Sequence, residues 1–323
     1  VFWVKPSVEF LEKYLKVNHY DVLVTTGPPH SLHLIGLNLK KKLPDLKWIA
    51  DFRDPWTEIS YYKHLKLTKI ADKKHRKLES EVFKNADITL ATSYTDAENF
   101  IKNGANAFCI TNGFDVDAST TLSMTEENSK TLPLSNSTTK FTLSYIGVLE
   151  QLRNPEILWE TLNVLVQENA DFKNDFELKF VGRLDDKILQ KIESSALKNN
   201  LTNLGYQTHD VALKHMQDST VLLMTNFPEE SSKGIIPGKI FEYLATGKTI
   251  LSFGPKDADV EKILIETKAG KHFGYDEKEN LKKFFLESYQ NWKLGMLNQN
   301  AENIEQFSRK NLTQKLVDLM NKI

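Results

Sequence analysis

The chain has 323 residues, of which 40% are hydrophobic and 26% charged, so it has the length for two domains and the composition of an ordinary globular protein. Its net charge of −1 gives no reason to expect nucleic acid as a partner, and no run reaches the roughly 18–20 apolar residues of a membrane span. The single cysteine, Cys109, excludes an intramolecular disulfide and fits a reducing, cytoplasmic compartment.

Short β-rich runs alternate with helical patterns in the first half of the chain. We expect strands at 21–26, 47–52, 87–92 and 107–111, and helices at 6–17, 30–43, 62–85 and 94–103. In the second of these helices, Leu32, Ile35, Leu39 and Leu43 recur at helical spacing and are expected to face a sheet. This alternation is typical of a parallel sheet covered by helices.

A polar segment then interrupts the alternation of strands and helices, which resumes after it. Residues 117–140 are rich in Ser, Thr and Asn and predict a surface linker. Further strands are expected at 141–147, 176–182, 220–226 and 248–253, and helices at 155–169, 186–199, 210–217, 238–246, 257–267, 277–292 and 298–323. The predicted organisation is an α/β domain at 1–122, a linker at 123–139, a second α/β domain at 140–290 and a terminal segment at 291–323.

The first domain is expected to be incomplete. It has about four strands and opens on a helix, whereas a doubly wound domain opens on a strand. The chain also starts abruptly at Val1, with no turn before it. We therefore expect a fragment or a processed product that is truncated at its N-terminal side.

Polar residues follow the predicted strands of the first domain. His30 comes after the first strand, and Asp51, Arg53 and Asp54 lie at the end of the second. Parallel strands place functional groups at their carboxyl ends, and a charge there is costly unless it is used or paired. We take His30, Arg53 and Asp54 as catalytic candidates. The alternatives are an ion pair or helix cap for the charges, and for His30 a helix-start residue whose ring packs on Trp56.

The second domain offers a similar set. Gly147 and Arg153 follow its first strand, and Gly182 and Arg183 follow the next one. Each arginine is a candidate ligand for an anionic group, and the alternative is again an internal ion pair.

The stretch from Lys233 to Leu251 is the most informative in the sequence. Gly238 opens a predicted helix, Lys239 and Glu242 lie in its first turn, and Gly247 closes it. A loop that feeds a helix N-terminus presents free N–H groups and the positive end of the helix dipole, which suits a phosphate. Because a carboxylate one turn in can reach hydroxyl groups of whatever carries that phosphate, the stretch predicts a sugar-nucleotide site.

The predicted helix at 62–85 is strongly basic. Seven lysine and arginine residues lie between Tyr61 and Lys77, and Leu67, Ile70, Leu78 and Val82 form a partial apolar stripe. Such a helix can make peripheral contact with anionic lipid headgroups. The alternative is a solvated lysine face on a helix that packs against the core.

Other chemistries lack their usual sequence signals. The chain contains no His-Glu-x-x-His motif and no cysteine pair, so we expect no bound metal. The dinucleotide-binding, P-loop and Gly-x-Ser-x-Gly motifs are also absent, so we expect no nucleotide cofactor.

Several segments together resemble the retaining glycosyltransferases of the family-4 type, which have the GT-B fold. The segments are 112–115, 145–147 with 153–155, 180–182 and, above all, 236–247. Residues 50–56 are also similar to the Arg-Asp-x-Trp stretch of bacterial members that build surface polysaccharides. The likeness runs in order from about Tyr20 to Gly254.

The resemblance implies two Rossmann-like domains that face each other across a cleft. It implies a nucleotide-diphosphate sugar held mainly by the C-terminal domain, a glycan or lipid-linked acceptor on the N-terminal one, and a terminal segment that crosses back. Transfer would retain the anomeric configuration and need no metal, because the helix dipole and basic side chains stabilise the leaving diphosphate. A bacterial, cytoplasmic enzyme is implied, placed at the inner face of the membrane by the basic helix.

Single residues carry the resemblance unevenly. Glu242 matches the second glutamate of the family's paired-glutamate motif, which binds the donor ribose. Gly234 stands where the first glutamate contacts the transferred sugar, and Glu229 or Glu230 would have to replace it.

The basic residues also depart from the family pattern. Val148 stands where an arginine is common, which leaves Arg153 as the phosphate ligand, with Lys239 either beside it or solvated. The family's glycine-bearing loop beside the acceptor has no counterpart. Two other functions therefore stay open: a nucleotide-sugar 2-epimerase, which needs no acceptor, and a non-catalytic protein that binds sugar nucleotides.

Overall fold

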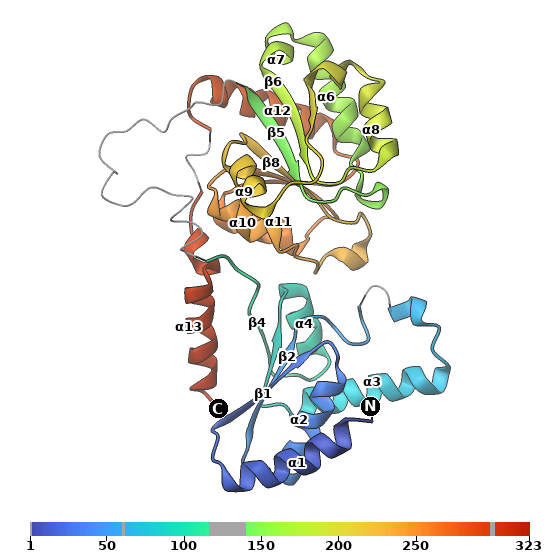
Figure 1. Cartoon of the computed structure of the whole chain (residues 1–323), viewed down its shortest axis with the longest axis vertical. Helices are drawn as coiled ribbons and strands as arrows, with labels where there is room; N and C mark the ends of the chain where they lie inside the picture. Colours follow the sequence, from blue (N-terminus) through green and yellow to red (C-terminus); the bar gives the residue numbers. More distant parts are fainter. Residues whose placement is uncertain (1, 60–61, 116–139, 298–300) are drawn as a thin grey trace, which may run out of the picture. The chain divides into compact units, whose positions relative to one another are not determined.

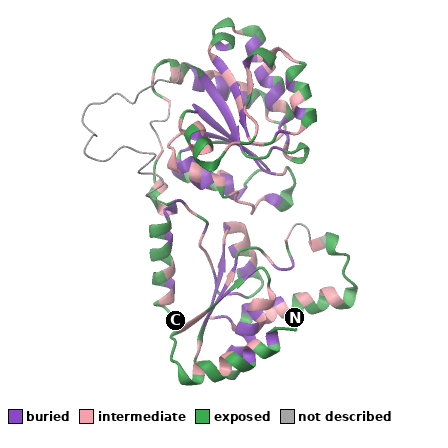
Figure 2. Ribbon diagram, in the orientation of Figure 1, coloured by how far each residue is buried: buried purple, intermediate pink, exposed green. Residues whose placement is uncertain are grey.

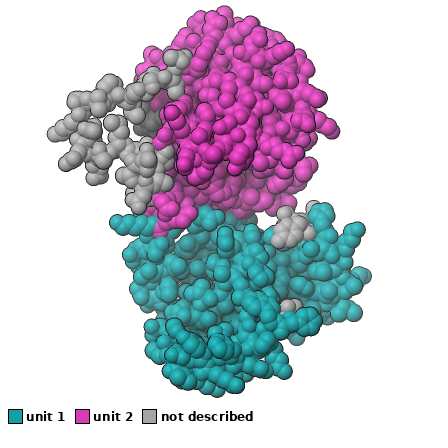
Figure 3. Space-filling view, in the orientation of Figure 1, with its two compact units in different colours: residues 1–112, 310–323 teal, residues 113–309 magenta. Residues whose placement is uncertain are grey.

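The computed structural model describes residues 2–59, 62–115, 140–297 and 301–323. The chain divides into two compact units, which Figure 3 colours separately: unit 1 is 1–112 with 310–323, and unit 2 is 113–309. The predicted linker at 123–139 lies outside the described residues. Each unit contains one parallel sheet, so both are of the α/β class.

Unit 1 is built on a four-stranded sheet within its described residues (Figure 1). The strands, in spatial order, are β1 (Val22–Gly27), β2 (Lys47–Phe52), β3 (Ile88–Ala91) and β4 (Ala107–Cys109). Its helices are α1 (Val4–Val17), α2 (Ser31–Lys42), α3 (Lys69–Asn85), α4 (Tyr94–Lys102) and α13 (Arg309–Met320), with a 3₁₀ turn η1 (Tyr62–Leu65).

Side chains of β2 alternate between two apolar layers, as expected for a strand. Trp48 and Phe52 lie in one buried cluster, and Ile49 lies in another, together with Ile88 and with Leu319 of α13. The sheet of unit 1 is therefore covered on both faces, one of them by the end of the chain.

Unit 2 contains a six-stranded parallel sheet in its described part. Its strands are β5 (Phe141–Ile146), β6 (Phe176–Val181), β7 (Leu201–Asn203), β8 (Val221–Thr225), β9 (Thr249–Phe253) and β10 (Gly270–Phe273), in the order β10-β9-β8-β5-β6-β7. The helices are α6 (Glu156–Glu168), α7 (Ala170–Asp175), α8 (Asp186–Glu193), α9 (His209–Gln217), α10 (Lys239–Ala245), α11 (Asp259–Thr267) and α12 (Lys278–Lys293). The 3₁₀ turns are η3 (Gln151–Arg153), η4 (Ala196–Asn200), η5 (Glu230–Ser232) and η6 (Ile304–Phe307).

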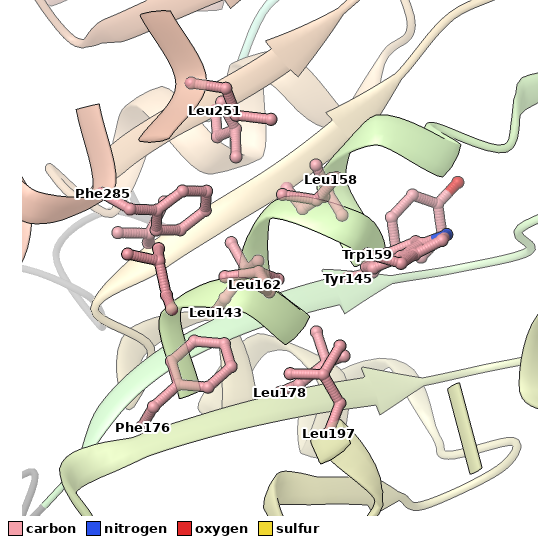
Figure 4. Packing of buried hydrophobic residues seen from close by; sticks show 14 of the residues in the cluster. Leu143, Tyr145, Leu158, Trp159, Leu162, Phe176, Leu178, Leu197, Leu251 and Phe285 are labelled. Carbon is pink, nitrogen blue, oxygen red and sulfur yellow. The ribbon is translucent and has the colours of Figure 1, made fainter. Parts of the chain in front are cut away.

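The core of unit 2 lies between its sheet and the helices. Figure 4 shows Leu143 and Tyr145 of β5 packed with Leu158 and Leu162 of α6 and with Phe285 of α12. All six residues of β5 are buried, as are those of β8 at the sheet centre (Figure 2). This burial explains why β8 reads as a nearly continuous apolar run in the sequence, whereas in β5 the buried hydroxyl residues Thr142 and Ser144 alternate with apolar ones.

Three predicted helices are interrupted. The helix expected over 62–85 is the turn η1 followed by α3, because Lys66 adopts a φ of 47° and the Thr68 side chain caps α3 by accepting from the N–H of Ala71. The helix expected over 298–323 is likewise split into η6 and α13. The helix expected over 186–199 is α8 followed by η4. These three predictions of continuous helices were wrong, and α7, β7 and β10 were not predicted; the remaining strands and helices follow in the predicted order.

Candidate functional site

The sheet order of unit 2 reverses between β5 and β8. In open parallel sheets, ligands bind outside the carboxyl ends of the strands at the point of reversal. Gly147 follows β5 there, and Asn226 follows β8. The Tyr275 hydroxyl donates to the Asn226 carbonyl at 2.5 Å, and the Asn226 amide donates to the Ile235 carbonyl at 2.8 Å. These two strand ends form the candidate site of unit 2.

Two glycines shape the ends of β5 and β6. Gly147 and Gly182 have φ angles of 116° and 123°, which L side chains rarely adopt. A Cβ atom added to Gly182 would lie 2.2 Å from the Gly147 carbonyl oxygen. The Gly147 N–H donates to the Val181 carbonyl at 2.8 Å. Only glycine at position 182 lets the two turns approach each other this closely.

Lys239 reaches from the start of α10 to the end of β5. Its Nζ lies 3.9 Å from the ring centroid of Tyr145 and donates to the Ile146 carbonyl at 3.5 Å. Desolvation, reinforced by the nearby Arg153 and opposed by Glu242, lowers the pKa of Lys239 to about 7. A lysine held half-neutral in this way gains a proton when an anion arrives beside it.

Arg153 brings a second cation to the same strand ends. Its guanidinium lies 5.5 Å from the ring centroid of Phe227, and its Nη2 donates to the Val148 carbonyl at 3.0 Å. The only ion pair that the described residues give it is with Glu150, at 3.5 Å. Its Nε is buried and has no hydrogen-bond partner among the described residues. The guanidinium is thus held in place with donor capacity to spare.

The N-terminus of α10 offers fewer free N–H groups than the sequence suggested. The N–H groups of Ile240 and Phe241 already donate to carbonyls of the preceding turn, at 3.0 and 3.2 Å. This leaves those of Gly238 and Lys239, and Gly238 is exposed with open space where a Cβ would stand. Glu242 is partly buried, and no described residue forms a hydrogen bond or ion pair with its carboxylate.

The loop after β8 carries the candidate sugar-contacting carboxylates. Glu229 and Glu230 are both exposed, but Glu230 pairs with Lys233 at 2.7 Å. Ser232 ties the loop together, because its hydroxyl lies 2.7 Å from the carbonyls of both Phe227 and Glu229. Gly234 lies further along the same segment and contributes no side chain. Among these described glutamates, Glu229 is the one without an ion pair.

Arg183 lies apart from Lys239 and Arg153, on the β6 side of the strand ends. Its side chain is exposed, and its carbonyl accepts from the N–H of Leu149 at 2.9 Å. Together with residues 148–152 and 184–187 it lines a pocket of about 530 Å³.

Two tyrosines at this site were missed in the sequence. The Tyr243 hydroxyl accepts from the N–H of Ile146 at 3.3 Å and donates to the Leu223 carbonyl at 3.4 Å, so it joins β5 to β8. Tyr275 joins the loop after β8 to the turn η3 by lying 3.4 Å from the Arg153 carbonyl. Burial raises the pKa of both hydroxyls. In an apolar sequence pattern such residues cannot be told from core aromatics.

In unit 1, His30 is held among aromatic rings. It stacks on Trp56, with ring centroids 5.4 Å apart and planes 11° apart, and on Phe52 at 5.6 Å. Desolvation lowers the pKa of His30 to about 4, although the Asp54 carboxylate opposes this shift. Its Nδ1 is buried without a described hydrogen-bond partner. At neutral pH the ring is therefore uncharged and has an unused nitrogen.

His33 lies beneath His30 and is fully buried. Its Nδ1 lies 2.9 Å from the Thr25 hydroxyl, which also accepts from the Trp48 indole N–H at 2.9 Å. Burial, with a smaller effect of His30, lowers the pKa of His33 to about 3. This histidine is thus a neutral core residue.

Arg53 and Asp54 project from the turn after β2. Both side chains are exposed, and neither forms an ion pair with any described residue. The main chain of Arg53 is fixed, because its N–H donates to the Gly27 carbonyl at 3.1 Å. Asp51 accepts from the Thr26 hydroxyl at 2.8 Å, and burial raises its pKa. The ion-pair alternative for Arg53 and Asp54 finds no support in the described contacts.

Glu79 of α3 holds the rest of that turn, which the sequence did not reveal. This buried carboxylate accepts from the N–H groups of Trp56 and Thr57, at 3.2 and 3.1 Å, and from the Thr57 hydroxyl at 2.5 Å. Burial raises the pKa of Glu79, while the Thr57 hydrogen bonds lower it. These hydrogen bonds fix Trp56, on which His30 stacks.

No described helix is both long and apolar enough to cross a membrane. No group of three or more described His, Cys, Asp or Glu side chains is arranged to hold a metal ion.

The chain was compared with known proteins. No protein-family model and no curated protein matches it. Among solved structures, it is similar to Anabaena Alr3699/HepE in complex with UDP, with 16% identity, a TM-score of 0.68, and coverage of 98% of this chain and 82% of that one. It is also similar to a glycosyltransferase from Rickettsia africae, with 13% identity, a TM-score of 0.67, and coverage of 99% and 81%.

A third solved structure belongs to another class of enzyme. It is a putative UDP-N-acetylglucosamine 2-epimerase from Listeria monocytogenes, with 14% identity, a TM-score of 0.54, and coverage of 99% of this chain and 78% of that one. At identities this low, the similarity establishes the fold, and the activity has to be inferred from the residues of the site. On this evidence, the chain has the GT-B fold.

Proposed function

We propose that the protein is a glycosyltransferase that moves a sugar from a nucleotide-diphosphate donor to a glycan or lipid-linked acceptor, with retention of configuration. The observation that carries this proposal is the gathering of Lys239, Arg153 and Glu242 near the switch point of the unit 2 sheet. Lys239 and Arg153 have the charge to bind a diphosphate, and Glu242 has a carboxylate free to bind ribose hydroxyls. The fold is shared with HepE, which was solved with UDP.

Each candidate residue then has a proposed role. The N–H groups of Gly238 and Lys239 and the cations of Lys239 and Arg153 would stabilise negative charge on the leaving diphosphate. Gly147 leaves room for the donor at the end of β5. No further cofactor is proposed, and charge stabilisation by these groups would take the place of a metal ion. In unit 1, His30, Arg53 and Asp54 would contact the acceptor.

The test is donor binding followed by turnover. Unfolding temperatures would be measured with UDP, GDP and their sugars, for the wild type and for Glu242→Ala. A nucleotide at 100 times its Kd should stabilise the protein by about 2.7 kcal/mol. Glu266→Ala is a matched control, because Glu266 is exposed on α11. If no nucleotide stabilises the protein, or if Glu242→Ala binds as tightly as the control, the site is assigned wrongly.

The missing carboxylate at Gly234 has a proposed replacement in Glu229. Because Glu230 already pairs with Lys233, Glu229 is the more available of the two. We expect Glu229→Gln to lower kcat with little change in the Kd of UDP, and Glu230→Gln to change neither. Equal losses of kcat in the two variants would show that neither has this special role.

The Listeria structure supports a second candidate function, a nucleotide-sugar 2-epimerase. An epimerase would convert a UDP-sugar without any acceptor, whereas a transferase releases UDP only as it glycosylates an acceptor or water. Chromatography of the nucleotide sugars after incubation without acceptor separates the two. Donor binding without either product would instead indicate a non-catalytic sugar-nucleotide-binding protein, which the departures at Gly234 and Val148 make a third candidate.

The proposed setting is the cytoplasm of a bacterium, in the synthesis of a cell-surface polysaccharide. Its support is the likeness of residues 50–56 to bacterial enzymes of that pathway. A lipid-linked acceptor would lie at a membrane, so contact with the inner face of the membrane belongs to the proposal.

A further inference from the structure

The hydroxyl of Tyr275 links three strand ends of the candidate site in unit 2, although the proposed transfer reaction gives it no role. Tyr275 follows β10, whereas the two main-chain carbonyls that its hydroxyl contacts follow β8 and β5. We propose that Tyr275 is a positioning residue, which holds the Arg153 guanidinium ready for the diphosphate of a nucleotide donor. This inference rests on the proposed function, because it concerns how that same site recognises a diphosphate.

Two routes of contact join Tyr275 to Arg153. In the direct route, the Tyr275 hydroxyl lies 3.4 Å from the Arg153 carbonyl. The second route begins with the Asn226 carbonyl, which accepts from the same hydroxyl at 2.5 Å. The Asn226 Oδ1 accepts from the N–H of Phe227 at 3.1 Å, and the ring centroid of Phe227 lies 5.5 Å from the Arg153 guanidinium. One hydroxyl group therefore holds both the main chain and the side chain of Arg153.

The groups that make these contacts are themselves fixed. The Tyr275 ring packs on Phe253, with centroids 5.7 Å apart. Burial raises the pKa of the Tyr275 hydroxyl, so it remains a protonated donor at physiological pH. Its one proton is shared by two carbonyls, and the shorter contact, to Asn226, is the stronger. Asn226 is buried, and its amide donates to the Ile235 carbonyl at 2.8 Å. Tyr275 thus contacts a rigid part of the loop after β8.

Arg153 has a side chain whose orientation matters for an anion. Its Nη2 donates to the Val148 carbonyl at 3.0 Å, and its Nε has no hydrogen-bond partner among the described residues. A guanidinium binds phosphate through parallel N–H groups, so its orientation sets the strength of the interaction. A side chain that is held before binding also loses less freedom when the ligand arrives. Tyr275 therefore contributes to diphosphate affinity without touching the ligand.

The alternative is that the Tyr275 hydroxyl only stabilises the fold, and Tyr289 provides the comparison. The Tyr289 hydroxyl donates to Asp175 at 2.5 Å, the same distance as from Tyr275 to its main acceptor. Its ring packs on Phe141, the first residue of β5, whereas Gly147 follows the other end of that strand. The two tyrosines thus make hydrogen bonds of equal length, but only Tyr275 contacts the strand ends of the candidate site.

The experiment is a double-mutant cycle read by calorimetric titration with UDP. It uses the wild type, Tyr275→Phe, Arg153→Met and the double variant. Tyr275→Phe keeps the ring and removes only the hydroxyl, and we expect the affinity for UDP to fall roughly threefold to tenfold. Arg153→Met should lose roughly tenfold or more. Because Tyr275 acts through Arg153, adding Tyr275→Phe to Arg153→Met should have no further effect.

Two controls separate positioning from a general loss of structure. Tyr289→Phe should bind UDP as the wild type does. Uridine, which lacks the diphosphate, should bind the wild type and Tyr275→Phe equally in an NMR titration. GDP and guanosine replace UDP and uridine if only GDP stabilises the wild type. Circular dichroism confirms that each variant is folded.

The inference is overturned if Tyr275→Phe binds UDP as tightly as Tyr289→Phe does. It is also overturned if the loss adds fully to that of Arg153→Met, or if uridine binding falls by the same factor. If the wild type binds no nucleoside diphosphate, the proposed function fails and this inference fails with it. A loss in Arg153→Met without any loss in Tyr275→Phe overturns this inference alone.

Discussion

Lys239 makes donor binding dependent on pH in a way that can be measured. In the free protein, desolvation and Arg153 lower the pKa of Lys239 to about 7. A bound diphosphate places negative charge beside the amine and should return this pKa toward its ordinary value. Lys239 would then take up a proton as UDP binds, and Lys239→Met should remove this effect.

The size of the effect follows from the two pKa values. With a free pKa of about 7, half of the amines are charged at pH 7 and roughly 1% at pH 9. If Lys239 stays charged in the complex, the affinity for UDP falls by roughly 50-fold between those pH values. The direction is fixed by the proton balance: the complex holds more protons than the free protein, so a rise in pH opposes binding.

Calorimetric titration with UDP in buffers of different ionisation enthalpy counts the protons directly. We expect roughly 0.9 proton taken up at pH 8 by the wild type and none by Lys239→Met, which should also bind more weakly at pH 7. Ionisation of UDP itself contributes equally to both proteins and cancels in their difference. Lys198→Met, at an exposed site on η4, should behave as the wild type. Equal proton uptake by the wild type and Lys239→Met would refute the reasoning.

Three further outcomes are expected. Gly182→Ala places a Cβ 2.2 Å from the Gly147 carbonyl oxygen, whereas the Cβ of Gly147→Ala meets no atom within 4 Å. Both variants carry roughly 1–3 kcal/mol of backbone strain, so chemical denaturation should show the larger loss of stability for Gly182→Ala. Glu79→Ala leaves three buried donors without an acceptor and should cost about 1–3 kcal/mol for each donor left unpaired, with faster hydrogen exchange at Trp56. The pKa of His33 is about 3 in the folded protein and 6.5 in the unfolded chain, so between these pH values the unfolded chain binds a proton that the folded protein does not. Stability should therefore fall as the pH drops from 6.5 toward 3, and it should fall less steeply in His33→Phe.

Most of the fold was predictable because its central strands are buried on both faces. β8 is a nearly continuous apolar run, and β5 alternates apolar residues with Thr142 and Ser144; both patterns are conspicuous between amphipathic helices. β7 and β10 were not predicted. They contain only three and four residues, and they lie at the two edges of the sheet, so their sequences do not show an apolar run. The break before α3 was missed because a single backbone angle, at Lys66, causes it.

The candidate site was predictable where backbone geometry requires a residue type. Gly147 and Gly182 are conspicuous in the sequence because glycine after a strand commonly marks a tight turn or a close approach of the backbone. Gly238 has helical backbone angles and open space where a Cβ would stand, so its backbone does not require glycine. What brings Lys239 to the end of β5 is a tertiary contact over Tyr145, which no spacing rule contains. The sequence also does not show which glutamate forms an ion pair. Glu229 and Glu230 are adjacent, and the structure shows that Glu230 is the one that pairs with Lys233.

Burial lowers the pKa of a basic residue in each of the two candidate centres, and this constrains their chemistry. Lys239 in unit 2 is half-neutral near pH 7, and His30 in unit 1, with a pKa of about 4, is neutral throughout the physiological range. A neutral imidazole can accept a proton or donate one hydrogen bond, but it cannot supply positive charge to a leaving diphosphate. If glycosyl transfer is the reaction, charge stabilisation would therefore come from Lys239, Arg153 and the N–H groups at the start of α10, and His30 would be restricted to orienting or deprotonating a hydroxyl. The same fold could not exchange these roles, because the aromatic rings of Phe52 and Trp56 that hold His30 are what keep it uncharged.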